Sequence, residues 1–324
     1  MYKKLYISSK FLIKNKKQNF SQIYIQPPAL LLKNRELLYQ TTNEILQSHD
    51  FFKQLKTQYP QKTHFSAYAG FDPTADSLHL GNLVSILTMV RLALIGIKPI
   101  FLIGGATGLI GDPSGKNQER EMLSRDQVTE NLKGIEDILR ISGSFEIINN
   151  YEFYKNMNII DFIRDIGKYF RMNTLLNKDT IAKRLETDQG ISYTEFTYTL
   201  LQAYDFERLF VDKNCVLQVG GSDQWGNITS GIDLIRRKHK SEAFGITTNL
   251  ILTSQGKKFG KSEGNALWID SKKTKYYDVY QYLINTPDQQ SIQYLKMLTF
   301  LRLDQIQEVQ YKKKYIICNY LFID

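Results

Sequence analysis

The sequence has few cysteines, prolines and histidines, and these shortages exclude several classes of protein. Of its 324 residues, two are cysteine, seven are proline and four are histidine. Cys215 and Cys318 cannot supply a disulfide framework, which favours a reducing compartment. Neither the cysteines nor the scattered histidines have the spacing of a metal site, so we expect no bound metal. No apolar run is long enough to span a membrane, so we expect no membrane partner.

Acidic residues are missing from the first 35 positions, where eight lysines and arginines occur. The whole chain has 42 basic and 33 acidic residues, so removing those eight leaves 34 basic against 33 acidic. Basic, hydroxylated, acid-free N-termini are typical of mitochondrial presequences, although lysine stands here where arginine is usual. We therefore predict a presequence over 1–35 and a location in the mitochondrial matrix. A cytoplasmic location and a basic arm that touches RNA are the alternatives.

A strand, a loop and a helix follow one another early in the chain. Alternation and aromatic residues predict a strand over 64–71, and apolar residues at helical spacing predict a helix from Asn82 onward. At such a helix opening, free backbone N–H groups and the helix dipole favour phosphate. His79 and Asn82 lie one turn apart there, and Gly81 lets a nucleotide approach the backbone. Helix capping is the alternative role; we keep it for Ser77 and expect none for His79.

A second segment, Lys258-Phe-Gly-Lys-Ser262, places two lysines three residues apart on a glycine-containing loop. Such a loop can close over a triphosphate and neutralise charge as pyrophosphate leaves. Taken alone, a basic cluster of this kind is more often a solvated surface turn. Taken with the earlier loop, it predicts one nucleotide-handling site assembled from distant parts of the sequence.

The His79-Leu-Gly-Asn82 and Lys258–Ser262 segments resemble the two signature motifs of class I aminoacyl-tRNA synthetases. Three further blocks resemble the bacterial and organellar tyrosyl-tRNA synthetase family, namely Gly104–Gly115, Leu201–Phe206 and Gly220–Asn227. The resemblance implies that the tyrosine carboxylate attacks the α-phosphate of ATP and that the tyrosyl group then moves to tRNA(Tyr). It also implies a homodimer, with ATP as a substrate, Mg²⁺ entering alongside it and no bound cofactor.

The resemblance assigns roles to individual residues. It places Tyr68 and Asp205 on the phenol of tyrosine, where phenylalanine would leave both buried and unpaired. Asp112 and Gln202 hold the amino group, with Tyr198 beside them. Further tyrosine-site positions are Gln224 and Thr107, the latter with a structural hydroxyl role as an equal alternative. The catalytic set comprises His79, Asn82, Thr74, Lys258, Lys261, Ser262, Lys116 and Arg120. The alternative role for Lys116 and Arg120 is that of solvated surface charges. The ATP-binding set comprises Gly70, Asp72, Gly81, Gly221, Asp223 and Lys261.

Strand and helix patterns alternate from His64 to about Gly245, including a strand over 98–103 and helices over 128–139 and 159–170. This alternation predicts a doubly wound parallel α/β sheet with ligands at the carboxyl ends of its strands. The resemblance makes it a Rossmann-like catalytic domain over 36–250, followed by a loop and linker over 251–285. It fades after Leu301, which predicts that 286–324 begins a truncated helical anticodon-binding domain.

Three other functions fit parts of the pattern. A free nucleotidyltransferase of the same phosphate-binding ancestry would not need the blocks at 201–206 and 220–227. A tryptophan-activating relative is a nearer alternative, but Tyr68 and Asp205 favour a phenol over an indole. An RNA-binding protein that assists intron splicing is the non-enzymatic alternative, and the intact set of substrate residues argues against it.

Overall fold

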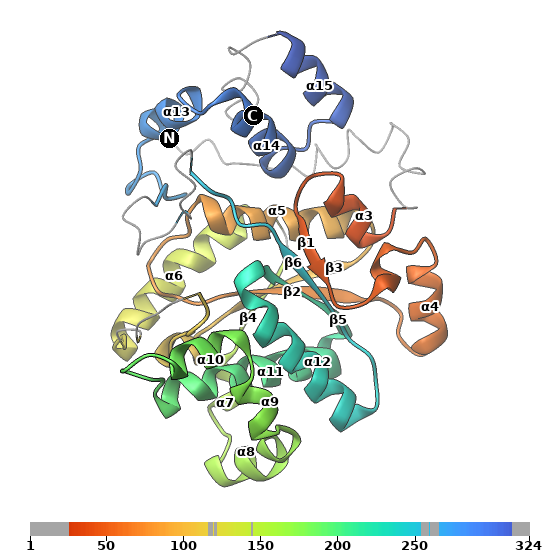
Figure 1. Cartoon of the computed structure of the whole chain (residues 1–324), viewed down its shortest axis with the longest axis vertical. Coiled ribbons are helices and arrows are strands. Elements are labelled where there is room, and N and C mark those ends of the chain that lie inside the picture. The colour runs from red at the N-terminus through yellow and green to blue at the C-terminus, as the bar shows by residue number, and fades with distance from the viewer. Residues whose placement is uncertain are drawn as a thin grey trace.

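A six-stranded sheet between layers of helices forms the centre of the molecule (Figure 1). The computed structural model describes residues 26–115, 119, 122–143, 145–253, 259 and 266–312, without the side chains of 310–312. The strands are β1 (Leu38–Thr41), β2 (Ser66–Phe71), β3 (Lys98–Ile103), β4 (Glu146–Asn149), β5 (Cys215–Gly221) and β6 (Phe244–Thr248). Their order is β1-β6-β5-β2-β3-β4, and every pair of neighbours is parallel except β1 and β6. The predicted doubly wound α/β sheet is confirmed, with an antiparallel strand at one edge.

Helices cover both faces of this sheet (Figure 1). The α-helices are α3 (Pro28–Lys33), α4 (Phe51–Gln58), α5 (Leu80–Leu94), α6 (Arg125–Ile141), α7 (Tyr151–Tyr154), α8 (Ile159–Asp165), α9 (Met172–Leu176), α10 (Asp179–Leu185), α11 (Tyr193–Lys213), α12 (Trp225–His239), α13 (Tyr276–Ile284), α14 (Asp288–Leu298) and α15 (Leu303–Lys312). Short 3₁₀ turns are η2 (Glu44–Gln47), η3 (Thr107–Leu109), η4 (Gly167–Tyr169) and η5 (Ser222–Gln224). Helices α5 and α6 lie on one face, and α11 and α12 lie on the other.

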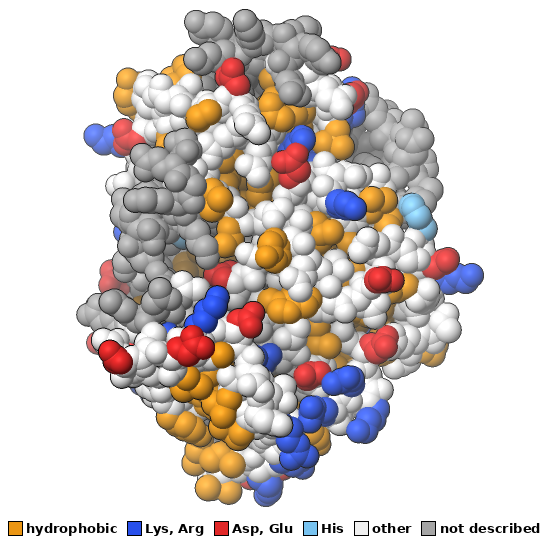
Figure 2. Space-filling model, in the orientation of Figure 1, with side chains coloured by type: hydrophobic (Ala, Val, Ile, Leu, Met, Phe, Trp, Pro, Cys, Tyr) orange, Lys and Arg blue, Asp and Glu red, His pale blue; other side chains and the backbone are white. Residues whose placement is uncertain are grey.

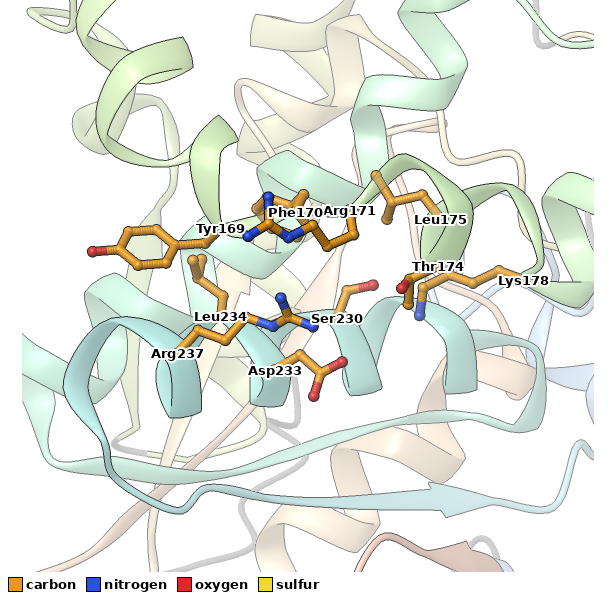
Figure 3. Close-up of a pocket in the computed structure, with 10 residues that line it drawn as sticks. All are labelled: Tyr169, Phe170, Arg171, Thr174, Leu175, Lys178, Ser230, Asp233, Leu234 and Arg237. Atoms are coloured by element: carbon orange, nitrogen blue, oxygen red, sulfur yellow. The ribbon is translucent and has the colours of Figure 1, made fainter.

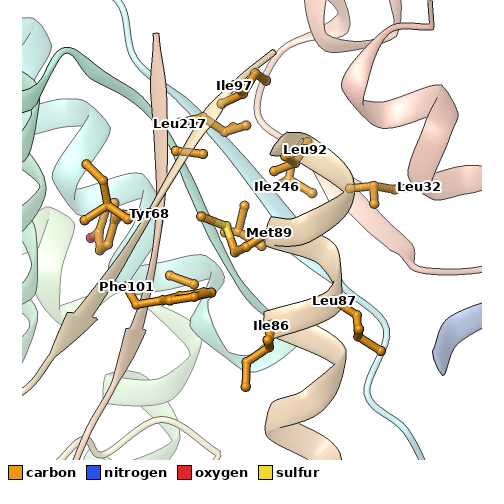
Figure 4. Packing of buried hydrophobic residues seen from close by; sticks show 14 of the residues in the cluster. Leu32, Tyr68, Ile86, Leu87, Met89, Leu92, Ile97, Phe101, Leu217 and Ile246 are labelled. Carbon is orange, nitrogen blue, oxygen red and sulfur yellow. The ribbon is translucent and has the colours of Figure 1, made fainter. Parts of the chain in front are cut away.

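Part of the main core lies where α5 crosses the central strands. Met89 on α5 faces the sheet near Leu217 and Ile246, while Tyr68 on β2 points to the opposite side (Figure 4). Each of these side chains is fully buried, and burying one large apolar side chain contributes about 1.5–3 kcal/mol. The predicted amphipathic helix is buried on more than one side because α14 packs against it from outside the sheet. The helix that begins at the candidate phosphate loop is therefore held firmly between two layers.

Strand order places the candidate site at a switch point. Strand β2 pairs with β3 on one side and with β5 on the other, with Tyr68 opposite Gln218. In doubly wound sheets, ligands bind outside the carboxyl ends of strands where the winding reverses direction. The segments that follow β2 and β5 meet at that edge, and both carry predicted site residues.

Two predicted helices differ from their observed forms in instructive ways. The helix predicted over 128–139 is α6, which is longer at both ends. It begins earlier because Ser124 and Gln127 form a capping box at its start. The helix predicted over 159–170 ends at Asp165 and gives way to the 3₁₀ turn that begins at Gly167. Glycine costs about 1 kcal/mol in a helix interior, which favours the break at this point.

Both ends of the described chain pack onto α5. Helix α3 lies inside the range predicted as a leader, yet Ala29 and Leu32 are fully buried in the main core. Arg35 and Arg91 each donate a hydrogen bond to the Thr299 carbonyl that ends α14. Residues from Pro28 onward therefore belong to the folded domain, and a cleavage after residue 35 would remove part of its core. Within the described residues, no helix has the length and apolar character needed to cross a bilayer.

Candidate active site

The two predicted nucleotide-handling segments meet at the start of α5. The Leu80 N–H donates to the Leu267 carbonyl at 2.9 Å, and the Ile269 N–H donates to the Leu78 carbonyl at 2.8 Å. Phe259, in the middle of the lysine motif, places its carbonyl oxygen 3.5 Å from where a Cβ on Gly81 would lie. Chain segments distant in sequence are thus brought together at one helix N-terminus.

His79 caps α5, so the expectation that it has no capping role is wrong. Its Nδ1 accepts the Gly81 N–H at 3.1 Å, and the Asn82 Oδ1 accepts the His79 N–H at 3.0 Å. The capping role kept for Ser77 is also wrong, because its hydroxyl donates to the Leu78 carbonyl and accepts the Asp270 N–H. The sequence pattern did not resolve which polar residue occupies the N-cap, since several suitable side chains stand in a row.

Capping determines how His79 presents its other nitrogen. Burial lowers the pKa of His79, which keeps the ring neutral near pH 7. With Nδ1 accepting the Gly81 N–H, the single ring proton lies on Nε2. A Cβ on Gly81 would come within 2.9 Å of the His79 ring, so glycine is needed for this packing. The geometry provides a neutral N–H donor at the positive end of a helix dipole.

Asp72 follows β2 and is held by two hydroxyl groups. Thr107 donates to its Oδ1 and Tyr198 donates to its Oδ2, both at 2.7 Å. Thr107 is buried and also accepts a hydrogen bond from Asn150, as expected for its structural alternative. A Cβ on Gly104 would lie 2.0 Å from the Asp72 Oδ1, so this loop approaches the carboxylate only with glycine there. Tyr198 and Thr107 therefore contact Asp72. Burial raises the pKa of Tyr198, and the charge of another carboxylate, Asp112, also raises it.

That other carboxylate, Asp112, belongs to a network of amides. Its Oδ2 accepts the Gln224 Nε2 at 2.7 Å, and its Oδ1 accepts the Asn227 Nδ2 at 3.4 Å. Gln202 Nε2 donates to the Gln224 Oε1 at 3.3 Å. Within the described residues, the buried Oε1 of Gln202 has no hydrogen-bond partner. The two predicted amino-group residues, Asp112 and Gln202, are thus linked through Gln224, with one acceptor left for a donor such as an ammonium group.

The deepest part of the site contains Tyr68 and Asp205. Tyr68 is fully buried with its ring 5.3 Å from that of Phe206, and within the described chain its hydroxyl has no partner. Burial raises the pKa of Asp205 to about 7, opposed by hydrogen bonds from Asn150 at 2.9 Å and Tyr154 at 2.7 Å. The charge of Asp205 adds to burial in raising the pKa of Tyr68, so the two groups interact. An unpaired hydroxyl beside a buried carboxyl suits a ligand hydroxyl.

Sequence reasoning missed Asn150 and Tyr154, which complete this deep end. Asn150 follows strand β4 directly, and a polar residue at the carboxyl end of a parallel strand was a usable indication. Tyr154 lies one turn later on α7 and carried no comparable sign, because the chain has 20 tyrosines. Only the packing of α7 against α11 brings its hydroxyl to Asp205.

The predicted nucleotide residues that are described lie around the mouth of the site. Gly70 is exposed, and a Cβ there would meet nothing within 4 Å. The Thr74 N–H donates to the Asp72 carbonyl at 2.8 Å. Asp223 follows β5 in η5, and its Oδ1 would lie 2.6 Å from a Cβ on Gly221. Five predicted catalytic positions fall outside the described residues: Lys116, Arg120, Lys258, Lys261 and Ser262.

A separate small cavity of about 20 Å³ lies between η4, α9 and α12 (Figure 3). Arg171 and Arg237 approach it from opposite sides, with Asp233 next to Arg237. That volume holds about one water molecule, so the cavity is too small for a nucleotide or amino acid.

Within the described residues, no three histidine, cysteine or acidic side chains are grouped to hold a metal ion.

Comparisons with known proteins place this geometry in a family. The family described as tRNA synthetases class I (W and Y) matches residues 60–317. A tyrosine-tRNA ligase of Streptococcus pneumoniae (strain CGSP14) is 48% identical over 286 residues, covering 86% of this chain. That of Streptococcus pyogenes serotype M49 (strain NZ131) is 47% identical over the same length. The chain spans 66% of the length of each of these two relatives.

Solved structures agree with the fold. A C-terminally truncated mitochondrial tyrosyl-tRNA synthetase of Aspergillus nidulans superposes with a TM-score of 0.77 at 27% identity, covering 95% of this chain and 94% of its own. Its Coccidioides posadasii counterpart gives 0.74 at 24% identity, covering 97% of this chain and 95% of its own, which supports the fold alone.

Proposed function

The chain belongs to the class I tRNA synthetases of the tryptophan and tyrosine group, and from that membership we propose that it activates L-tyrosine with ATP. The tyrosyl-adenylate would then donate its tyrosyl group to tRNA(Tyr). The 48% identity to a tyrosine-tRNA ligase supports the choice of amino acid. Because the chain spans 66% of that relative, tRNA charging is a separate claim from tyrosine activation.

One observation carries the choice of tyrosine. The Tyr68 hydroxyl lies buried without a partner in the described chain, next to the buried carboxyl of Asp205. A ligand phenol would bond to both groups, whereas a phenyl ring would leave the Tyr68 hydroxyl unpaired and would offer no donor to Asp205. A buried unpaired polar group costs about 1–3 kcal/mol, more when it is charged. This penalty supports selection of tyrosine over phenylalanine, and the indole of tryptophan has no hydroxyl to offer.

Amino-acid-dependent exchange of pyrophosphate into ATP tests this proposal. The full chain should exchange with tyrosine and much more slowly with phenylalanine or tryptophan. Because the reaction stops at the adenylate, it needs no tRNA and isolates the first step. Exchange with tryptophan alone would move the chain to the other half of the family. A folded protein with no exchange would favour the RNA-binding alternative.

Activation needs no covalent enzyme intermediate, so positioning and charge stabilisation would supply the catalysis. The neutral Nε2–H of His79 and the amide of Asn82 lie at the N-terminus of α5, where they would meet the phosphates of ATP. Magnesium would enter with ATP as part of that substrate. Lys258 and Lys261 would add positive charge, and the contact of Phe259 with this helix start supports that placement.

Binding of tRNA is supported by a basic surface at the end of α12. Its last turn carries Arg236, Arg237 and Lys238, and Lys240 follows directly. Of these, Arg236 pairs with Asp233, and Lys238 pairs with Glu207. Clustered lysine and arginine side chains bind a phosphate backbone through counterion release, so binding here would weaken as salt rises.

A homodimer is supported by apolar side chains exposed on one end of the molecule. Figure 2 shows such side chains gathered at the bottom of the view, over α8. The exposed apolar side chains of α7 to α11 include Tyr151, Ile159, Ile160, Ile163, Met172, Leu176, Leu185 and Tyr193. Tyr193 is 76% exposed and Ile159 66%, which is unfavourable for a lone chain in water. Sedimentation should give twice the 37.7 kDa of one chain, and a monomer would refute the dimer.

A location in the mitochondrial matrix is supported by the basic, acid-free N-terminus and by two structural relatives described as mitochondrial. The burial of α3 restricts where a leader could be removed, because cleavage after Pro28 would take away core residues. Imported protein should therefore begin before Pro28, and sequencing the N-terminus of protein recovered from mitochondria tests this.

A further inference from the structure

The hydroxyl of Tyr154 lies between two oxygen atoms of α11. It is 2.7 Å from the Asp205 Oδ1 and 2.8 Å from the Leu201 carbonyl oxygen. A phenol has one proton to donate, so it serves one of these acceptors at a time or divides the bond between them. Its ring packs edge-on against Tyr204 at 5.6 Å, which holds the hydroxyl in place from the side.

The other oxygen of Asp205 is also held. Asn150 Nδ2 donates to the Asp205 Oδ2 at 2.9 Å, and Asn150 Oδ1 accepts the Ala106 N–H at 2.8 Å. The backbone donor leaves only one orientation for the Asn150 amide, since a flipped amide would place two donors together. Each oxygen of Asp205 therefore has one donor from the protein, and each can accept another. The carboxylate is fixed in orientation and still has capacity for a ligand.

We propose that Tyr154 is a specificity-determining positioning residue, which orients the Asp205 carboxylate toward the phenol of bound tyrosine and stabilises it as an acceptor. This inference rests on the proposed function. Tyr154 acts through Asp205 and needs no contact with the substrate. When Asp205 is ionised, the Tyr154 hydroxyl donates to it. When Asp205 is protonated, that hydroxyl can donate to the Leu201 carbonyl and accept a hydrogen bond from the Asp205 carboxyl O–H instead.

This arrangement links tyrosine binding to proton release. Burial and the charge of Asp72 raise the pKa of Asp205 to about 7, while the Tyr154 and Asn150 hydrogen bonds lower it. A phenol that donates to Asp205 needs the ionised form, so kcat/KM for tyrosine should rise with pH through about 7. Among the described residues, the titratable groups that interact electrostatically with Asp205 are Tyr68 on β2, Asp72 after β2, Tyr154 on α7, and Tyr198 and Tyr204 on α11.

Replacing Tyr154 by phenylalanine removes the hydroxyl and keeps the ring. In Y154F, kcat/KM for tyrosine in pyrophosphate exchange should fall roughly tenfold or more, the effect of one hydrogen bond to a charged group. The value for phenylalanine should stay the same, because a phenyl ring does not use Asp205. Since loss of active protein would lower both values together, the ratio of the two separates positioning from a merely structural effect.

The pH profile gives a second readout. Removing a hydrogen bond to the carboxylate raises the pKa of Asp205, so the rise in kcat/KM for tyrosine should move to higher pH in Y154F. Y169F is the matched control, since it removes a hydroxyl from another ring that packs against the same apolar cluster as Tyr154, and it should leave both the ratio and the profile unchanged. Should Y154F fail to fold, Tyr154→Gln supplies a shorter donor, and its ratio should also fall below that of the wild type.

Two outcomes have different meanings. If wild-type protein exchanges with tyrosine and Y154F keeps the full tyrosine-to-phenylalanine ratio and the same pH profile, the inference about Tyr154 is wrong and the proposed function stands. If wild-type protein shows no preference for tyrosine, the proposed function itself is wrong. Equal losses for both amino acids in Y154F would assign Tyr154 a structural role and also overturn the inference.

Discussion

The candidate site has two ends that are built in different ways. The phenol end is the deep end, around Tyr68 and Asp205, and the phosphate end is the mouth, at the start of α5. At the phenol end, buried side chains from β2, the β4–α7 junction and α11 converge, and each oxygen of Asp205 has a protein donor. At the phosphate end, the described groups are backbone N–H donors and two neutral side chains at one helix N-terminus. The first arrangement suits a ligand hydroxyl in one fixed place. The second suits any phosphate that enters.

The two ends differ in the free-energy cost of leaving their polar groups without a ligand. Water can reach the mouth of the site, so an empty helix N-terminus is hydrated at little cost. Tyr68 and Asp205 lie where burial is nearly complete, so a ligand that cannot pair with them leaves the buried Tyr68 hydroxyl without a partner in the described chain. Discrimination should therefore depend on the deep end, and the rate of activation on the mouth.

The largest effect is expected from His79→Asn, which changes the mouth alone. Asparagine is among the best N-cap residues, so α5 should keep its cap and the protein its thermal stability. The Nε2–H donor is lost, and removing one preorganised donor from developing charge costs about 10²–10³ in kcat. Pyrophosphate exchange should slow by about that factor, with KM for tyrosine unchanged.

Two comparisons sharpen this test. His79→Ala should lose the cap as well and be about 1 kcal/mol less stable, which separates capping from catalysis. The tyrosine-to-phenylalanine ratio should be the same in the asparagine variant and the wild type. A large change in that ratio would show that the two ends are not independent.

The next largest effect is expected from Asp205→Asn, which changes the deep end alone. An amide of the same shape cannot take a negative charge, so the phenol of tyrosine loses a charge-assisted hydrogen bond of about 1.5–3 kcal/mol. The preference for tyrosine over phenylalanine in exchange should fall by roughly 10- to 100-fold. Turnover at saturating tyrosine should change much less, in contrast to the His79 variant.

The same variant should change how stability depends on pH. The pKa of Asp205 is raised from 3.8 to about 7 on folding, so the folded state binds its proton more tightly than the unfolded state. This contribution to wild-type stability is present below pH 4 and is lost as the pH rises to about 7. At pH 8, Asp205→Asn should unfold with a free energy higher by about 2–4 kcal/mol. Equal stabilities of the variant and the wild type at pH 8 would show that folding does not raise the pKa of the Asp205 carboxyl.

The fold was largely predictable because local patterns and global architecture agree. The strand over 98–103 has the predicted bounds, and α5 begins two residues before its predicted start. A buried parallel strand leaves a continuous apolar run, and an amphipathic helix leaves a repeat of 3.6 residues. The antiparallel strand β1 is short and half-exposed, so its sequence carries neither pattern.

The candidate site was less predictable because hydrogen-bond partners depend on distances between elements. The motifs identified Asp72, Asp112 and Tyr198 as site residues. In the structure, the Tyr198 hydroxyl donates to Asp72, and side-chain amides donate to Asp112. Choosing between two carboxylates requires the separation of α11 from the loop after β2. The role of Tyr154 requires the position of α7, which spacing along the chain does not encode.

The smallest effect is expected from Gly81→Ala, which tests how tightly the mouth is built. The added Cβ would lie 2.9 Å from the His79 ring, closer than such contacts normally come, so the ring must move by a few tenths of an ångström. Alanine also favours a helix by about 1 kcal/mol, so the free energy of unfolding should change little. A displaced donor should slow exchange by up to about tenfold.

Gly226→Ala is the matched control, because it adds a Cβ to another helix opening, where the nearest atom would be a Lys178 side-chain carbon at 3.8 Å. That variant should be slightly more stable and exchange at the wild-type rate. Gly81→Ala should keep the tyrosine-to-phenylalanine ratio, since its Cβ points at His79 and away from the deep end. If the ratio fell while the rate held, the mouth would help to choose the amino acid, and the division of the site into a selecting end and a reacting end would be wrong.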